Sequence, residues 1–132
     1  MPIVVQALDP ASHQDQQDLQ KIYQDAPHWL FAPHDDARQL IASALQEGRL
    51  IAARFNDRLL GAGYLQRHSD GWYLSHLCVR TITRRRGVAE RLVSQAWEMA
   101  RAQGASLYLL APAGHLEAQA LAAKLQLELK AL

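Results

Sequence analysis

The turn between one predicted strand and the helix after it constrains this chain more than any other segment. The residues before it, Trp72–Arg80, are rich in aromatic and β-branched side chains and follow the turn Ser69-Asp70-Gly71, so they predict a strand. From Val88 to Gly104, small and apolar residues recur at helical spacing and predict a helix packed back on that strand. Such a turn directs the first helical N–H groups and the positive end of the helix dipole at whatever lies above it, an arrangement that binds phosphate.

Arginines surround this helix start. Five of the chain's 14 lysine and arginine residues lie there: Arg80, Arg84, Arg85, Arg86 and Arg91. Backbone N–H groups and guanidinium groups would together hold a pyrophosphate, although a solvated basic turn is the alternative for a motif this short. The formal net charge of the chain is only +1, so the basic cluster is local. With no groove-reading motif beside it, we expect no nucleic-acid binding.

The length of the chain predicts one domain. Its 132 residues can bury a single core without disulfides or metals, so we expect one domain over residues 1–132. The only cysteine, Cys78, has no internal partner, and the first ten residues lack the basic flank and apolar stretch of a signal peptide. No apolar run approaches a membrane span, so we expect a cytoplasmic protein that does not bind membranes.

Hydrophobic patterns and turn residues predict the element order β-α-α-β-β-β-α-β-α-β, a mixed α/β sheet with helices on both faces. Strands are expected at 3–8, 50–55, 59–66, 72–80, 106–110 and 127–129, and helices at 12–24, 37–46, 88–104 and 115–125. Ser12 and either Asp35 or Asp36 are predicted helix caps, and Asn56-Asp57-Arg58 a tight turn.

Two local features of the pattern need separate comment. Gly61 and Gly63, in one strand, indicate a bulge or a close approach. Two prolines exclude a continuous helix between Ala26 and Asp36, which predicts an aromatic loop. That segment holds four possible metal ligands, His28, His34, Asp35 and Asp36, but no metal-site spacing organises them, so no metal is expected.

The spacing Arg84-x-x-Gly87-x-Ala89 resembles the acyl-CoA signature Q/R-x-x-G-x-G/A of the GNAT (Gcn5-related N-acetyltransferase) superfamily. The predicted element order is similar to the GNAT fold over essentially the whole chain. The resemblance implies that acetyl-CoA binds with the amides of its pantetheine arm on one strand and its pyrophosphate on the helix start. The implied strand residues are Leu77, Cys78 and Val79, and the implied phosphate-binding residues are Arg84, Arg85, Arg86, Gly87, Val88 and Ala89.

The C-terminal segment His115–Leu127 resembles a second GNAT pattern, N-x-x-A-x-x-L-Y-x-K-L-G-F. Two departures matter for function. Ala122 occupies the position at which many GNAT enzymes carry a tyrosine that protonates the departing CoA thiolate, and alanine has no proton to donate. His115 stands at the position of a cofactor-contacting asparagine. The sequence also stops short of a seventh strand, so either the sheet is short or a partner completes it.

Within the superfamily the chain is most similar to the PanZ (also called PanM) family. The similar segments are 15–22, 52–60 and 83–88. The resemblance implies an acetyl-CoA-responsive regulator of the maturation or activity of aspartate α-decarboxylase in pantothenate biosynthesis. Arg54 and Asn56, expected to be exposed near a strand turn, are the candidate partner contacts, although Asn-Asp is also a common turn pair. The region from Tyr23 to Leu50 is longer here than in that family and leaves the partner open.

The alternative function is an N-acetyltransferase that moves acetyl from acetyl-CoA to a primary amine of a small molecule or protein. Such a reaction needs a base for the ammonium group and a stabiliser for the tetrahedral oxyanion. Ser75 and His76 are the candidate catalytic residues, because imidazole titrates near neutral pH, but a histidine on a strand can equally be structural. Trp29 is expected to pack in the core or in a loop, and the alternative is that Trp29 and Phe31 line the acceptor cleft. A monomer or weak homodimer is expected.

Overall fold

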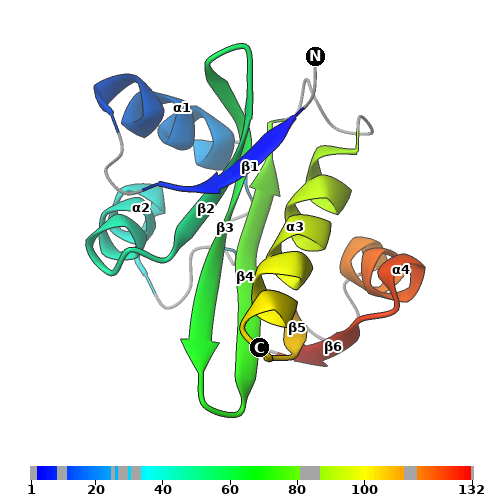
Figure 1. The fold of residues 1–132 in the computed structure, drawn as a ribbon. Coiled ribbons are helices and arrows are strands. Elements are labelled where there is room, and N and C mark those ends of the chain that lie inside the picture. The colour runs from blue at the N-terminus through cyan, green and yellow to red at the C-terminus, as the bar shows by residue number, and fades with distance from the viewer. Residues whose placement is uncertain are drawn as a thin grey trace.

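The computed structural model describes residues 3–8, 12–24, 26, 30, 34–80, 87–111 and 116–131. One sheet of six strands, in the order β1-β2-β3-β4-β5-β6, carries helices on both faces (Figure 1). In chain order the elements are β1 Val4–Ala7, α1 His13–Gln24, α2 Ala37–Gln46, β2 Leu50–Phe55, β3 Arg58–His68, β4 Gly71–Val79, α3 Val88–Ala102, β5 Leu107–Ala111, α4 Leu116–Leu125 and β6 Glu128–Ala131. The predicted α/β class and element order are confirmed.

The sheet is mixed: its first four strands are antiparallel and its last two pair in parallel. Strands β1 to β4 pair antiparallel with one another, whereas β5 pairs parallel with β4 and β6 pairs parallel with β5. Parallel neighbours need a crossover, and α3 and α4 supply the two crossovers. None of the helices in the described ranges is long and apolar enough to cross a membrane.

Alternating side chains of the strands divide the core into two layers. Leu50 and Ala52 of β2 are buried with α1 and α2 on one face, while Ile51 and Ala53 are buried with α3 on the other. Successive side chains of a strand point to opposite faces of the sheet, which explains the alternation. A strand that is buried on both faces is therefore apolar along its length. Figure 1 shows α1 and α2 together on one side of the sheet, with α3 and α4 on the other.

The predicted helix caps are present. The backbone N–H of Asp15 donates to Ser12 Oγ at 3.0 Å, and the N–H of Ser12 donates back to the Asp15 carboxylate at 3.4 Å, a reciprocal cap that begins α1. Of the two acids proposed for α2, Asp36 is the cap and accepts the Gln39 N–H at 2.9 Å. The chain then leaves α2 through Gly48, whose φ of 66° favours glycine.

The turn between β2 and β3 is tighter than the sequence suggests. Asn56 and Asp57 have φ of 49° and 65°, so two residues with positive φ connect the strands, as in a hairpin with a two-residue loop. The prediction that Arg58 belongs to the turn is wrong, because Arg58 is the first residue of β3 and pairs with Phe55. The hairpin therefore presents Asn56 and Asp57 at its tip.

Candidate functional site

The strands β4 and β5 diverge from each other along their length. Their pairing covers only Trp72 to Leu74 of β4 and Leu107 to Leu109 of β5. β4 continues to Val79 and β5 to Ala111, and in this described part of the sheet no further pair joins them. The backbone edge of β4 beyond Leu74 is therefore not taken up by the neighbouring strand.

A bulge in β4 coincides with the divergence. Ala62 of β3 faces Cys78, and Tyr64 faces Ser75, so His76 and Leu77 together lie opposite Gly63. Two residues against one is the defining count of a β-bulge, and His76 has a φ of 54°, which is unusual for a residue other than glycine. The expectation of a bulge at the glycines of β3 is confirmed.

A buried tyrosine of α1 makes a hydrogen bond to the backbone of the bulge. Tyr23 of α1 donates its hydroxyl to the carbonyl oxygen of His76 at 2.6 Å. Burial raises the pKa of Tyr23, so the phenol keeps its proton and remains a donor. Strained backbone persists only where its surroundings determine it, and this hydrogen bond is one such determinant.

The start of α3 lies against β3. A Cβ atom on Gly61 would come within 3.0 Å of Val88 Cγ1 and 3.1 Å of Leu92 Cδ1, so the absence of a side chain at Gly61 lets the helix approach this closely. The other alternative expected for these glycines, a close approach by another element, is thus confirmed at Gly61. Val88 and Leu92 are both buried, which fixes the first turns of α3 on the sheet.

Gly87 begins α3. Its φ is 78°, its carbonyl accepts the first helical bond from the Arg91 N–H at 2.9 Å, and a Cβ atom there would meet no atom of the described residues within 4 Å. The first N–H groups of a helix have no acceptor within the helix, and the helix dipole is positive there. Gly87, Val88 and Ala89 thus lie at the start of α3, and their binding of a phosphate stays a prediction, while Arg84, Arg85, Arg86 and His115 lie outside the described residues.

The implied pantetheine-binding residues are on β4 beyond the bulge. Leu77 is half-buried, whereas Cys78 and Val79 are buried on opposite faces of the sheet, in the α1 and α2 layer and the α3 layer respectively. The thiol of Cys78 donates to the carbonyl of Ile22 at 3.3 Å, and this cysteine is free of any disulfide. Their side chains therefore pack in or against the core, and a role of their backbone in ligand binding stays a prediction.

Ser75 and His76 form a buried pair at the bulge. Ser75 Oγ and His76 Nδ1 are 2.8 Å apart, and the two residues are 1% and 7% exposed. The ring of Tyr64 stands edge-on to His76 at 5.8 Å, and its hydroxyl donates to Glu47. Burial, and then the bond to Glu47, raises the pKa of Tyr64 to about 12. The catalytic role of Ser75 and His76 stays a prediction.

Ala122 of α4 faces the core. It is 3% exposed and belongs to the apolar layer beneath α3. Lys124, two residues on, bonds Glu90 of α3 at 3.0 Å and ties the two helices together. The position that aligns with the GNAT tyrosine is thus occupied by a buried alanine, which packs in the core and has no proton to donate.

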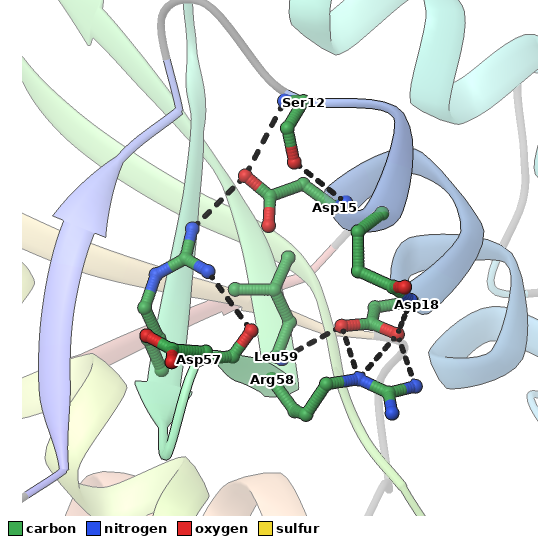
Figure 2. Close-up of polar contacts among 8 residues, drawn as sticks. Ser12, Asp15, Asp18, Asp57, Arg58 and Leu59 are labelled. Carbon is green, nitrogen blue, oxygen red and sulfur yellow. Dashed lines mark hydrogen bonds and ion pairs between the residues drawn. The ribbon is translucent and has the colours of Figure 1, made fainter.

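Two aspartates of α1 are functional candidates that sequence reasoning missed. Asp15 accepts from Arg54 Nη2 at 2.9 Å, and Asp18 accepts from Arg58 Nη2 at 2.7 Å, as Figure 2 shows. Both acids are buried and lie with Leu19 and Ile22 on the inward face of α1. A charged residue on the apolar face of a helix needs a partner, which is the signal that was available in the sequence.

These ion pairs also shift the pKa values of the two acids. The hydrogen bond from Arg54 holds the pKa of Asp15 below its ordinary value. Burial opposes ionisation of Asp18, but hydrogen bonds from Arg58, Leu59 and Gln14 outweigh it and lower the pKa of Asp18. The expectation that Arg54 is exposed is wrong, since its side chain is 23% exposed and ion-paired, whereas Asn56 is exposed as expected.

The fold can be compared with solved structures. The ribosomal-protein-S18-alanine N-acetyltransferase of Escherichia coli superposes with a TM-score of 0.72 at 18% identity, over 94% of this chain and 76% of that one. The PaiA N-acetyltransferase of Thermoplasma acidophilum, solved with coenzyme A, gives 0.70 at 14% identity, over 94% and 88%. The chain therefore has the fold of these N-acetyltransferases.

Sequence comparison narrows the class. The family model described as the acetyltransferase (GNAT) domain PanZ matches residues 2–129. The chain is 40% identical over 95 residues to the PanD regulatory factor of Salmonella typhimurium, across 72% of this chain and 66% of the relative. It is 34% identical over 117 residues to the PanD regulatory factor of Escherichia coli, across 86% and 80%. The chain belongs to the PanZ family of GNAT domains.

Proposed function

We propose that this protein is an acetyl-CoA-responsive regulator of aspartate α-decarboxylase (PanD). The observation that carries the proposal is the match to the PanZ family over residues 2–129. The two relatives bear the name PanD regulatory factor, which supports the decarboxylase as the partner. In this proposal acetyl-CoA and the partner are coupled ligands, so each changes the affinity of the chain for the other.

Acetyl-CoA would lie between β4 and the start of α3. The backbone of Leu77 to Val79, beyond the last pair with β5, would bond the amides of pantetheine. The N–H groups of Gly87 to Ala89 would hold the pyrophosphate, and the start of α3 at this point, with N–H groups that have no acceptor within the helix and a positive dipole end, supports this placement. Arg84, Arg85 and Arg86 would add charge to the cradle and His115 a further contact. Two GNAT neighbours, the PaiA enzyme and an aminoglycoside 6'-N-acetyltransferase, were solved with coenzyme A.

The hairpin between β2 and β3 would contact the partner. Asn56 is exposed at its tip in the left-handed region, and Arg54 lies two residues before it with a partly exposed side chain. Both side chains carry polar groups suited to hydrogen bonds with another protein. The two-residue turn by itself explains why asparagine and aspartate occur at this position. The proposed partner contact is therefore supported by the similarity to the PanZ family.

An N-acetyltransferase is the second candidate, and the buried Ser75 and His76 pair at the bulge favours it. His76 would deprotonate the amine directly or through a water molecule, and backbone N–H groups of β4 would stabilise the oxyanion. Ala122 offers no acid for the departing thiolate. Release of CoA in the presence of a broad panel of amines, compared between the wild type and His76→Gln, tests this candidate. Release at the uncatalysed rate would eliminate it.

The first experiment is native mass spectrometry of this protein with unprocessed aspartate α-decarboxylase from the same source, with and without acetyl-CoA. We expect a complex that depends on acetyl-CoA. If acetyl-CoA binds and no complex forms, the regulator proposal is refuted and the acetyltransferase becomes the better candidate.

A further inference from the structure

Two ion pairs fasten the β2–β3 hairpin to α1. Arg54 and Arg58 flank the turn at Asn56 and Asp57, and each reaches an aspartate one helical turn from the other. Figure 2 shows the contact of Asp18 with Arg58 and Leu59. The two aspartates, Asp15 and Asp18, are three residues apart on the inward face of α1. The hairpin that carries the candidate partner contacts is therefore oriented by a helix about 40 residues away in sequence.

The pair between Asp18 and Arg58 is the more completely bonded. Asp18 is 1% exposed, and its carboxylate accepts from Arg58 Nε and Nη2, from the Leu59 N–H at 3.1 Å and from Gln14 Nε2 at 3.0 Å. One of these donors is backbone of β3 itself. Asp18 thus fixes the start of β3 whatever the side chain of Arg58 does.

The pair between Asp15 and Arg54 is less complete. Arg54 gives one N–H of Nη2 to Asp15 and one of Nη1 to the Asp57 carbonyl at 3.3 Å. A guanidinium has five N–H groups, so three remain without an acceptor among the residues that the structure describes. The side chain is 23% exposed, and it therefore keeps donors for an external acceptor while its orientation is already set.

We propose that Asp15 is a positioning residue for partner binding: it holds Arg54 so that the remaining N–H groups of the guanidinium receive carbonyl or carboxylate oxygens of a partner protein at the hairpin. The proposal rests on the proposed function and adds to it the residue that prepares the contact. Arginine suits this role because its planar donors match carboxylate and carbonyl oxygens.

Preorganisation sets the size of the expected effect. Ordering one long side chain on binding weakens affinity by about threefold to tenfold, and Asp15 removes that cost in advance. Loss of Asp15 should therefore weaken the partner complex by about that factor. Loss of Arg54 should weaken it further, because the partner's acceptors then lose their donor as well.

The test is a double-variant cycle with acetyl-CoA saturating and unprocessed aspartate α-decarboxylase as titrant. We expect Asp15→Asn to weaken the complex about threefold to tenfold, and Asp15→Asn with Arg54→Ala to be no weaker than Arg54→Ala alone. Asp36→Asn is the matched control, because Asp36 caps α2 as Asp15 closes the cap of α1 but does not touch the hairpin. Losses that add independently, or an equal loss in the control, would overturn the proposal.

A second measurement needs no partner and separates this inference from the proposed function. In NMR spectra of the chain alone, the Arg54 Nε–H signal should move or broaden in Asp15→Asn and stay in place in Asp36→Asn. An unchanged Arg54 signal overturns the positioning role. If that signal changes but the wild type forms no complex with the decarboxylase, the proposed function fails and the partner half of the inference fails with it.

Discussion

Gly87 and Gly104 form a natural matched pair for testing the phosphate site. They flank α3 at its two ends with φ of 78° and 71°, and within the part of the chain that the structure describes a Cβ atom on either would meet nothing within 4 Å. Alanine at either position therefore adds conformational strain and no clash. The left-handed region costs roughly 1–2 kcal/mol for a residue with a side chain, so Gly87→Ala and Gly104→Ala should lower stability equally.

Glutamate at the same two positions separates stability from binding. A carboxylate about 6 Å from one phosphate charge, at an effective dielectric constant of about 20, costs about 3 kcal/mol, or roughly a hundredfold in affinity. At Gly104 the same charge is beyond the far end of the 15-residue α3, about 22 Å away by helical rise and more than a Debye length at physiological salt. Only Gly87→Glu should therefore abolish tight binding.

Calorimetric titration with acetyl-CoA and thermal melts followed by circular dichroism measure the two effects. The expected result is a similar fall in melting temperature, roughly 3–10 °C, for both alanine variants, and a loss of acetyl-CoA affinity confined to Gly87→Glu. Unchanged affinity in Gly87→Glu would refute the placement of the pyrophosphate at α3. Equal losses in Gly87→Glu and Gly104→Glu would show that the effect comes from unfolding.

Three further predictions concern stability and catalysis. Because the folded pKa of Asp18 is lowered, its contribution to stability is present above the unfolded value of about 3.9 and is lost as pH falls through the folded value; melts from pH 3 to 6 should show a steeper fall for the wild type than for Asp18→Asn. Gly61→Ala should destabilise by about 1–3 kcal/mol in urea denaturation, since the added Cβ atom lies 3.0 Å from Val88 Cγ1. Ala122→Tyr should lower the melting temperature without creating CoA release in an amine panel, because this 3% exposed position has no room for a phenol. A fully stable Ala122→Tyr variant with new activity would contradict that last expectation.

Local patterns were sufficient to predict the elements of this fold. The cap at Ser12, the cap at Asp36 and the glycine after α2 are interactions within a few residues, so the sequence displays them directly. The bulge at His76 is different, because it depends on how two strands pair. Gly61 and Gly63 were its only trace in the sequence, and they did not indicate which residue of the opposite strand would be displaced.

The candidate site was predicted unevenly for the same reason. Gly87 belongs to a short motif that the sequence displays directly, and the structure places it immediately before α3, where the helix was predicted to begin. The ion pair of Arg54 joins residues 39 positions apart, so a local interpretation of the hairpin treated that arginine as exposed. The acidic residues on the apolar face of α1 indicated that long-range partners exist. They did not indicate which arginines these partners are.

Binding and chemistry depend on different parts of this fold. The proposed acetyl-CoA contacts use backbone groups of β4 and of the start of α3, which substitutions of exposed side chains leave in place. Acid catalysis needs one particular side chain on α4, and there the chain has Ala122, packed beneath α3 and held in a helix that Lys124 ties to Glu90. A tyrosine could enter only by displacing that packing. If the proposed backbone contacts hold acetyl-CoA, the chain has what a cofactor-responsive regulator needs. At Ala122 it lacks a group that an acetyltransferase commonly uses, so the regulator proposal agrees with the burial of Ala122.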